Sequence, residues 1–312
     1  MKKALPLEPT MRADTAVKAI LKTQLDIIQI NEPAIVQDID PEHLHNYRVA
    51  LRRTRVALAQ AKGVFDTAIT HRFKTDLKQI TQMSNELRDL DVYLLAEDDY
   101  QKLLPDTFRP DIVPLFDYLR EKRMVVLEKT IKELTSKKFQ HIMADWEAFV
   151  TEAQSETADA PYADRSIILL AQKRIYKRYQ RVVKDGQKIL SAAGDEEMHA
   201  LRIECKKLRY LLEFFASLFP EEDINLLVKQ LKNLQDNLGD FNDLCVQEDY
   251  LLAIAAELPT HKNQSRQTLL AIGALVAILH EQRLALKDAF VEPFDTFTAE
   301  QNHKRIKQLF QN

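Results

Sequence analysis

The amino-acid sequence predicts an all-α protein made of two pseudo-symmetric four-helix bundles around a basic central groove. Three observations lead to this fold class. The 312 residues include only 5 glycines and 11 prolines, fewer than many strands joined by tight turns would need. Apolar residues recur with helical periodicity along most of the chain. A pattern of basic residues also occurs twice, once in each half of the chain.

The apolar periodicity places the helices along the chain. We expect them over about 12–30, 42–63, 68–98, 111–150, 164–192, 195–218, 221–257 and 264–290, with a short helix after about 297. Prolines or turn-forming residues at 31–33, 40–41, 105–114 and 219–220 separate several of them. The polar stretch 151–164 divides the chain into a first half, 1–155, and a second half, 156–312.

Composition limits the class of protein. The net charge of −3 and the pI near 6.3 disfavour a general nucleic-acid binder, which is usually basic overall. Any anion site must therefore come from local segregation of charge. The apolar stretch at 269–279, about eleven residues, is too short to cross a bilayer, so no membrane partner is expected. The N-terminus lacks the apolar run of a signal peptide, and two helical cysteines, Cys205 and Cys245, favour a reduced cytoplasmic setting.

The repeat carries most of the chemistry. HNYRVALRRTRVAL from His45 aligns with HALRIECKKLRYLL from His199 at an offset of 154 positions. This offset pairs Arg48 with Arg202, Arg52 with Lys206, Arg53 with Lys207 and Arg55 with Arg209. On the helix that follows, an offset of 151 pairs Lys78 with Lys229 and Asp89 with Asp240. Weaker correspondences link Arg123 with Arg283, and Lys18 and Lys22 with Arg174 and Arg178.

On a helical wheel, the basic residues of each repeat gather on one side and the apolar residues on the other. A solvated surface would also place charges there, but surface helices usually mix signs because like charges one turn apart repel. Segment 45–55 contains four arginines and no acid, and 199–209 contains four cations and one acid. We therefore favour an anion site over a solvated or structurally paired face.

Arginine suits oxyanions because its planar guanidinium donates two parallel hydrogen bonds and stays charged. A row of such groups spaced one turn apart fits a repeating anion better than a single phosphate. His45 and His199 are either switchable donors in this site or helix N-terminal residues bonded to a neighbouring carboxylate or to backbone. The acids of the second helix, Asp89, Asp91, Asp240 and Asp243, are expected to pair with and orient the arginines.

Catalysis has little support in the sequence. The chain lacks the phosphate-binding loop GxxxxGK[ST], the dinucleotide motif GxGxxG, the zinc motif HExxH, the pair CxxC and the nucleophile elbow GxSxG. His43 and His45, two positions apart on a helix, do not converge on a metal ion. We expect a non-catalytic protein without a metal or another cofactor.

The duplicated pattern H-x-x-R-x-x-x-[RK]-[RK]-x-R, followed by a helix ending in L-[RG]-D, resembles the conserved histidine α-helical domain, CHAD. The resemblance covers about 18–297 and implies two four-helix bundles around a basic cavity that binds inorganic polyphosphate. The binding residues expected from the motif and the repeat are His45, Arg48, Arg52, Arg53, Arg55, Lys78, Arg123, Arg174, Arg178, His199, Arg202, Lys206, Lys207, Arg209, Lys229 and Arg283. Lys206 and Lys207 keep the charge of the arginines in the first half but lack the bidentate fork.

Two other functions use the same cations. One is a nucleic-acid or nucleotide-phosphate binder, which the acidic pI disfavours. The other is a helical scaffold whose basic faces dock an acidic protein partner. The expected location is the cytoplasm, with polyphosphate granules as a further site of association.

Overall fold

A computed structural model describes residues 5–152, 160–191, 194–258 and 263–311. Within these ranges every regular element is helical, which confirms the all-α class. The α-helices are α1 Ala13–Val36, α2 Pro41–Gln60, α3 Thr67–Met83, α4 Asn85–Leu95, α5 Glu97–Leu103, α6 Arg109–Leu134, α7 Lys137–Thr151, α8 Ile167–Ser191, α9 Asp195–Phe214, α10 Glu221–Glu257, α11 Asn263–Asp288, α12 Val291–Thr298 and α13 Glu300–Phe310, and a 3₁₀ turn, η1, covers Ala216–Leu218.

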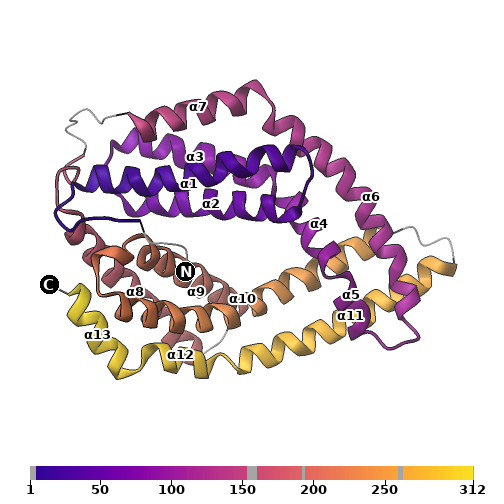
Figure 1. Cartoon of the computed structure of the whole chain (residues 1–312). Helices are drawn as coiled ribbons and strands as arrows, with labels where there is room; N and C mark the ends of the chain where they lie inside the picture. The colour runs from indigo at the N-terminus through magenta and orange to yellow at the C-terminus, as the bar shows by residue number, and fades with distance from the viewer. Residues whose placement is uncertain (1–4, 153–159, 192–193, 259–262, 312) are drawn as a thin grey trace.

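The helices form three packed groups (Figure 1). One group contains α1, α2, α3 and α7, and its core includes an edge-to-face contact between Phe73 and Trp146 with ring centroids 5.0 Å apart. A second contains α8, α9, α12, α13 and the first part of α10. The third joins α4, α5 and α6 to α11 and the end of α10, where the Tyr93 and Tyr250 rings stack 4.3 Å apart. Helices α2 and α9, which carry the repeated basic motif, contact each other.

Several helix starts follow from local sequence. The side chain of Asp40 accepts a hydrogen bond from the Glu42 amide at 2.7 Å, and Pro41 occupies the first turn of α2. Asp66 caps α3 through the Ile69 amide at 2.9 Å. These side chains satisfy amides that have no partner within the helix, so the boundaries at these points are encoded locally.

Other boundaries differ from the sequence-based expectation. Helix α1 continues through Pro33 to Val36, because Pro33 removes only its own N–H from the helix and the burial of Ala34 and Ile35 holds the last turn. The helix expected over 68–98 is broken at Ser84, which separates α3 from α4. The helix expected over 111–150 ends at Leu134, and the Ser136 side chain caps a new helix through the Phe139 amide at 3.2 Å.

The division into halves at 155 and 156 lies outside the described residues. The arrangement of each half as one four-helix bundle also stays a prediction, because α4, α5, α6 and α11 extend beyond the two larger groups (Figure 1).

The turn at Gly63 contacts Tyr162. The Tyr162 amide donates a hydrogen bond to the Gly63 carbonyl at 2.8 Å. Gly63 has φ of 83°, and an added Cβ would lie 2.7 Å from the Tyr162 ring. This turn therefore requires glycine both for its backbone and for space.

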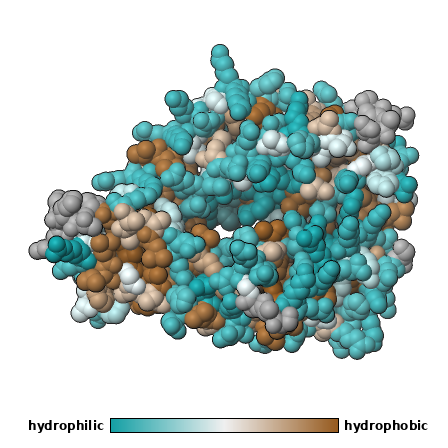
Figure 2. All heavy atoms as spheres, turned by 180° about the vertical axis from the view of Figure 1, so that it is seen from behind, coloured by the Kyte–Doolittle hydropathy of each residue, from teal (hydrophilic) through white to brown (hydrophobic). Residues whose placement is uncertain are grey.

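One segment is more apolar than the sequence analysis anticipated. Ser265–Thr298 contains a window that is long and apolar enough to cross a membrane, and 22% of that window is buried. Leu270 on α11 and Val125 on α6 are exposed, and Figure 2 shows a hydrophobic patch at the end of the molecule where these helices lie. Core helices of soluble proteins meet the same criterion of length and composition. The absence of a membrane partner therefore stays a prediction.

Candidate anion-binding site

A cavity of about 470 Å³ lies between α2, α3 and α9. Its lining contains no aspartate or glutamate among the described residues. The basic side chains that line it are Arg52, Arg55, His71, Lys74, Lys78, Arg202, Lys206 and Lys207. Figure 2 shows the molecule from behind, with a hollow near its centre that is bordered mostly by hydrophilic residues.

Helical periodicity explains how α2 and α9 present these cations. On α2 the buried face includes Tyr47, Leu51 and Leu58, and this packing turns Arg52 and Arg55 away from the core. On α9 Leu201, Cys205 and Leu208 are buried, and Arg202 and Lys206 lie on the other side of the helix. Each helix therefore delivers its basic side chains to the space between them.

Lys206 lies near other cations of this site. Burial, followed by the charges of Arg202 and Arg52, lowers the pKa of its amine to about 7. Burial also lowers the pKa of Arg202 and of Arg55. Among the described residues, Arg52, Arg55 and Lys206 form no ion pair. The charge of these three side chains is therefore not neutralised by an ion pair within the described part of the protein.

Arg202 and Arg48, which the repeat makes equivalent, have different partners. Arg202 donates to Asp243 at 3.0 Å on the margin of the cavity. Arg48 donates hydrogen bonds to the Thr81 carbonyl and the Ser84 hydroxyl, both at 2.9 Å. These acceptors lie where α3 ends and α4 begins. Burial lowers the pKa of Arg48 to about 10. Arg48 therefore supports the break between these helices, while Arg202 faces the cavity.

The two histidines of the repeat also differ. His45 is half-buried, and its pKa is lowered by burial and by the charge of Arg88. His199 is exposed, and its Nδ1 donates a hydrogen bond to the side chain of Asn242. Neither histidine lines the cavity. The partner of His199 is a side-chain amide, whereas the structural alternative expected from the sequence was a bond to a neighbouring carboxylate or to backbone.

Four expected binding residues take part in ion pairs with Glu213 or Glu204. Arg53 donates to Glu213, and Arg209 lies 3.5 Å from the same carboxylate. Arg178 donates to Glu204, and Lys207 donates to it at 2.8 Å. Burial acts to raise the pKa of Glu204, but the bonds from Lys207 and Arg178 outweigh burial and lower it.

Arg123 and Arg283 lie away from the cavity in matched ion-pair networks. Arg123 donates to Asp91 at 2.7 Å and to both oxygens of Asp38, just before α2. Arg283 donates to Glu248 at 2.7 Å and to Asp195 in the first turn of α9. The hydrogen bonds that Arg123 donates, led by those to Asp38, raise its pKa. Both arginines are only 13% exposed, so they anchor the starts of the two motif helices.

The remaining expected residues, Arg174, Lys78 and Lys229, do not lie together. Arg174 donates to the Lys62 carbonyl at 3.0 Å, and burial lowers its pKa. Lys78 lines the cavity, whereas Lys229, its counterpart in the repeat, is exposed on α10 and does not line it. Of the acids expected to orient arginines, Asp91 and Asp243 accept hydrogen bonds from Arg123 and Arg202.

Sequence reasoning missed His71 and Lys74, which line the cavity beside Lys78. Their signal was present, because positions 71, 74 and 78 recur at intervals of three and four on one face of α3. The site residues that the structure brings together therefore come from three helices. Within the described residues, no group of three or more histidine, cysteine or acidic side chains is arranged to hold a metal ion.

Comparisons with known proteins agree with this architecture. A crystal structure of the CHAD domain from the plant Ricinus communis matches with a TM-score of 0.78 and 26% identity, covering 94% of each chain. PptA from Streptomyces chartreusis shares the fold, with a TM-score of 0.67 and 14% identity over 91% of this chain and 100% of that one.

An uncharacterised protein of Mycobacterium tuberculosis is 25% identical over 264 residues, which are 81% of this chain. The chain spans about half the length of that relative, 48%. The family model of the CHAD domain matches residues 19–252, most of the chain and both copies of the basic motif. The chain therefore belongs to the CHAD domain family.

Proposed function

We propose that the protein binds inorganic polyphosphate in the cavity between α2, α3 and α9 and catalyses no reaction on it. The observation that carries this proposal is the set of basic side chains in a cavity whose described lining has no carboxylate. Three of these side chains, Arg52, Arg55 and Lys206, have no ion-pair partner among the described residues. An anion with several charges would offset the repulsion between them.

The arrangement of the cations favours a linear polyanion over a single phosphate. Arg52 and Arg55 of α2 face Arg202 and Lys206 of α9. Helix α3 adds a third row of basic side chains, which are His71, Lys74 and Lys78. Successive basic residues on one helix are spaced about 5 Å apart, so neighbouring phosphates of a chain reach successive side chains. The two arginines on α2 provide bidentate donors, and the lysines on α3 and α9 provide point charges.

We assign different roles to the expected residues that do not line this cavity. Arg48, Arg123 and Arg283 hold helices in place through their internal bonds. Arg53 and Arg209 pair with Glu213, and Arg178 pairs with Glu204. We propose that these residues position the cavity walls and that the cations lining the cavity make the contacts with phosphate. Cytoplasmic location, including association with polyphosphate granules, is part of the same proposal.

Calorimetric titration with long-chain polyphosphate at two salt concentrations tests this function, with transfer RNA as competitor. We expect tight binding that weakens steeply with salt, because a bound polyanion releases condensed counterions. We also expect polyphosphate to resist competition by RNA of equal charge. Preference for RNA would indicate a nucleic-acid binder. Absence of binding to either polymer at low salt would overturn the proposal and favour a scaffold for an acidic protein.

A further inference from the structure

Five basic side chains form a row on the exposed face of α8. The members of this α8 row are Lys173, Lys177, Arg181, Lys184 and Lys188. All five are exposed, and their spacing of three and four residues places them within about 80° of one another around the helix axis. With a rise of about 1.5 Å per residue, the row is about 22 Å long. The buried side of α8 includes Ile175, Tyr179 and Val182 and packs against the core.

Three of the five cations in this row are unpaired within the described residues. Lys173, Lys177 and Lys184 form no ion pair there. Arg181 and Lys188 each lie 3.4 Å from Asp185, which is the single acid in segment 173–188. Like charges one turn apart repel, and a surface helix reduces this cost when acids alternate with bases. The row therefore carries a surplus of positive charge that an external anion would offset.

The α8 row meets the anion cavity at Glu204 of α9. Lys207, which lines the cavity, donates a hydrogen bond to Glu204 at 2.8 Å, and the Nε of Arg181 lies 3.6 Å from the same carboxylate. Glu204 is only 7% exposed, whereas Arg181 is 63% exposed. The carboxylate thus lies beneath the surface, and the cationic surface continues from Lys207 to Arg181.

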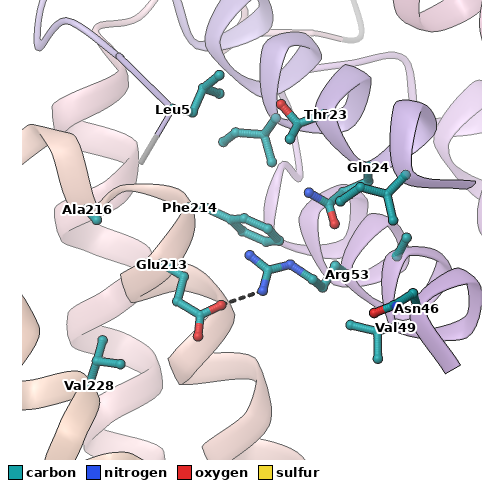
Figure 3. Close-up of a pocket in the computed structure, with 13 residues that line it drawn as sticks. Leu5, Thr23, Gln24, Asn46, Val49, Arg53, Glu213, Phe214, Ala216 and Val228 are labelled. Atoms are coloured by element: carbon teal, nitrogen blue, oxygen red, sulfur yellow. Dashed lines mark hydrogen bonds and ion pairs between the residues drawn. The ribbon is translucent and has the colours of Figure 1, made fainter. Parts of the chain in front are cut away.

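Two other sides of the cavity are less suited to an anion. On another face of α2, Arg53 is paired with Glu213 beside mostly apolar walls that include Phe214 (Figure 3). On α3, Arg72 is paired with Asp145 at 3.2 Å. A polyanion that left the cavity on the first side would lose its hydration without gaining a free cation, and on the second side it would meet an acid. The α8 row offers unpaired cations instead.

We propose that a long polyanion chain held in the anion cavity continues along the α8 row, which binds the segment that extends beyond the cavity. This inference rests on the proposed function and adds a preference for long chains over short ones. The cavity holds a short stretch of phosphates, and the row adds contacts only for a chain that reaches Arg181 and passes it. The lysines of the row act as flexible point charges and need no fixed phosphate geometry.

Calorimetric titration with tripolyphosphate and with long-chain polyphosphate separates the row from the cavity. The triple variant Lys173→Ala, Lys177→Ala, Lys184→Ala removes the unpaired lysines of the row. We expect it to bind long-chain polyphosphate about tenfold more weakly, with a slope of log affinity against log salt that is shallower by about two. Tripolyphosphate affinity should stay within about twofold of the original, because the short chain does not reach the row and salt screens distant surface charges.

A matched control removes the same charge elsewhere. Lys129→Ala, Lys132→Ala, Lys138→Ala replaces exposed lysines of α6 and α7 that form no ion pair among the described residues. We expect it to keep the long-chain affinity within about twofold. Arginine at the three substituted positions of the row should also keep the affinity, because it keeps the charge. Unchanged long-chain affinity in the variant of the row, or equal weakening by the control, would overturn the inference.

Acetylation of lysines, read by mass spectrometry, locates the bound chain on the original protein. Long-chain polyphosphate should protect Lys177 and Lys184 as well as Lys74 and Lys78 of the cavity, and tripolyphosphate should protect the cavity lysines alone. If both polymers protected the cavity and left the row reactive, the row would be refuted and the proposed function would stand. If neither polymer bound the original protein, both proposals would fail together.

Discussion

Arg53 of α2 donates a hydrogen bond to Glu213 of α9, which joins the first copy of the basic motif to the second. The guanidinium of Arg53 also lies 5.0 Å from the Phe214 ring. Arg52, one position earlier, lines the anion cavity and has no ion pair among the described residues. Adjacent arginines on one helix therefore serve different purposes, one in joining helices and one in presenting charge.

This difference predicts opposite effects on stability. Arg53→Met should lower the free energy of unfolding by about 1–2 kcal/mol, because it leaves Glu213 without its hydrogen-bonded partner. Arg52→Met should leave stability unchanged or raise it, since it relieves repulsion with Arg202 and Lys206. Urea denaturation of both variants measures the effect. A larger loss for Arg52→Met than for Arg53→Met would contradict these roles.

Polyphosphate affinity should depend on the cations that line the cavity. The double variant Arg52→Ala with Arg202→Ala should weaken binding by about a hundredfold, because each substitution removes charge-assisted hydrogen bonds. The slope of log affinity against log salt should become shallower by about one to two. Titrations at several salt concentrations measure both quantities.

A matched control separates location from net charge. Lys129→Ala with Lys132→Ala removes the same formal charge from exposed positions on α6. We expect this variant to bind nearly as tightly as the original protein. Equal weakening by both double variants would mean that affinity follows overall charge, and the cavity would lose its assigned role.

Binding should take up a proton at Lys206. Its pKa is about 7 in the free protein, and a bound polyanion would raise it. Below about pH 7 the amine is protonated in both states, so affinity is highest there. As pH rises above about 7 the free protein loses this proton, binding must take it up, and affinity falls by up to about tenfold per pH unit.

Calorimetry in buffers of different ionisation enthalpy measures this proton uptake. The control is Lys206→Arg, which keeps the positive charge but does not titrate near neutral pH. We expect this variant to show less proton uptake and a flatter affinity profile than the original protein. Unchanged uptake would assign the proton to a group other than Lys206.

Lys206 should also reduce the stability of the free protein. Because its pKa is lower in the fold than in the unfolded chain, the unfolded chain binds more protons, and this group's contribution to stability rises between about pH 7 and about pH 10. Lys206→Met should therefore raise the melting temperature most at and below about pH 7, and less as pH increases. The same variant should bind polyphosphate more weakly. A lower melting temperature at neutral pH would contradict this account.

Arg123 should matter for folding and not for binding. Arg123→Ala leaves Asp91, whose side chain is 1% exposed, without its ion-pair partner and should cost about 3 kcal/mol of unfolding free energy. Polyphosphate affinity measured well below the melting temperature should stay within about twofold of the original. Arg120→Ala, in an exposed network with Glu97 and Asp117, is the matched control and should cost less than about 1 kcal/mol. A large loss of affinity in Arg123→Ala would place that residue at the anion.

Much of the fold could be predicted from sequence because its determinants are local. The alternation of apolar and basic positions on α2 and α9 was sufficient to predict their buried faces and their cationic stripes. Asp40 and Pro41 marked the start of α2 for the same reason. The break at Ser84 had no such signal, since it depends on bonds from Arg48, which is distant in sequence.

The sequence by itself determined the helical class, the duplicated basic motif and the family resemblance, because a helical period and a repeat are properties of neighbouring positions. Tertiary structure alone decided which partner each cation of the repeat has. Arg48 and Arg202 are equivalent in the repeat, yet one binds the α3–α4 junction and the other faces a cavity. The physical reason is that charge pairing, burial and the pKa of Lys206 depend on side chains brought together from separate helices.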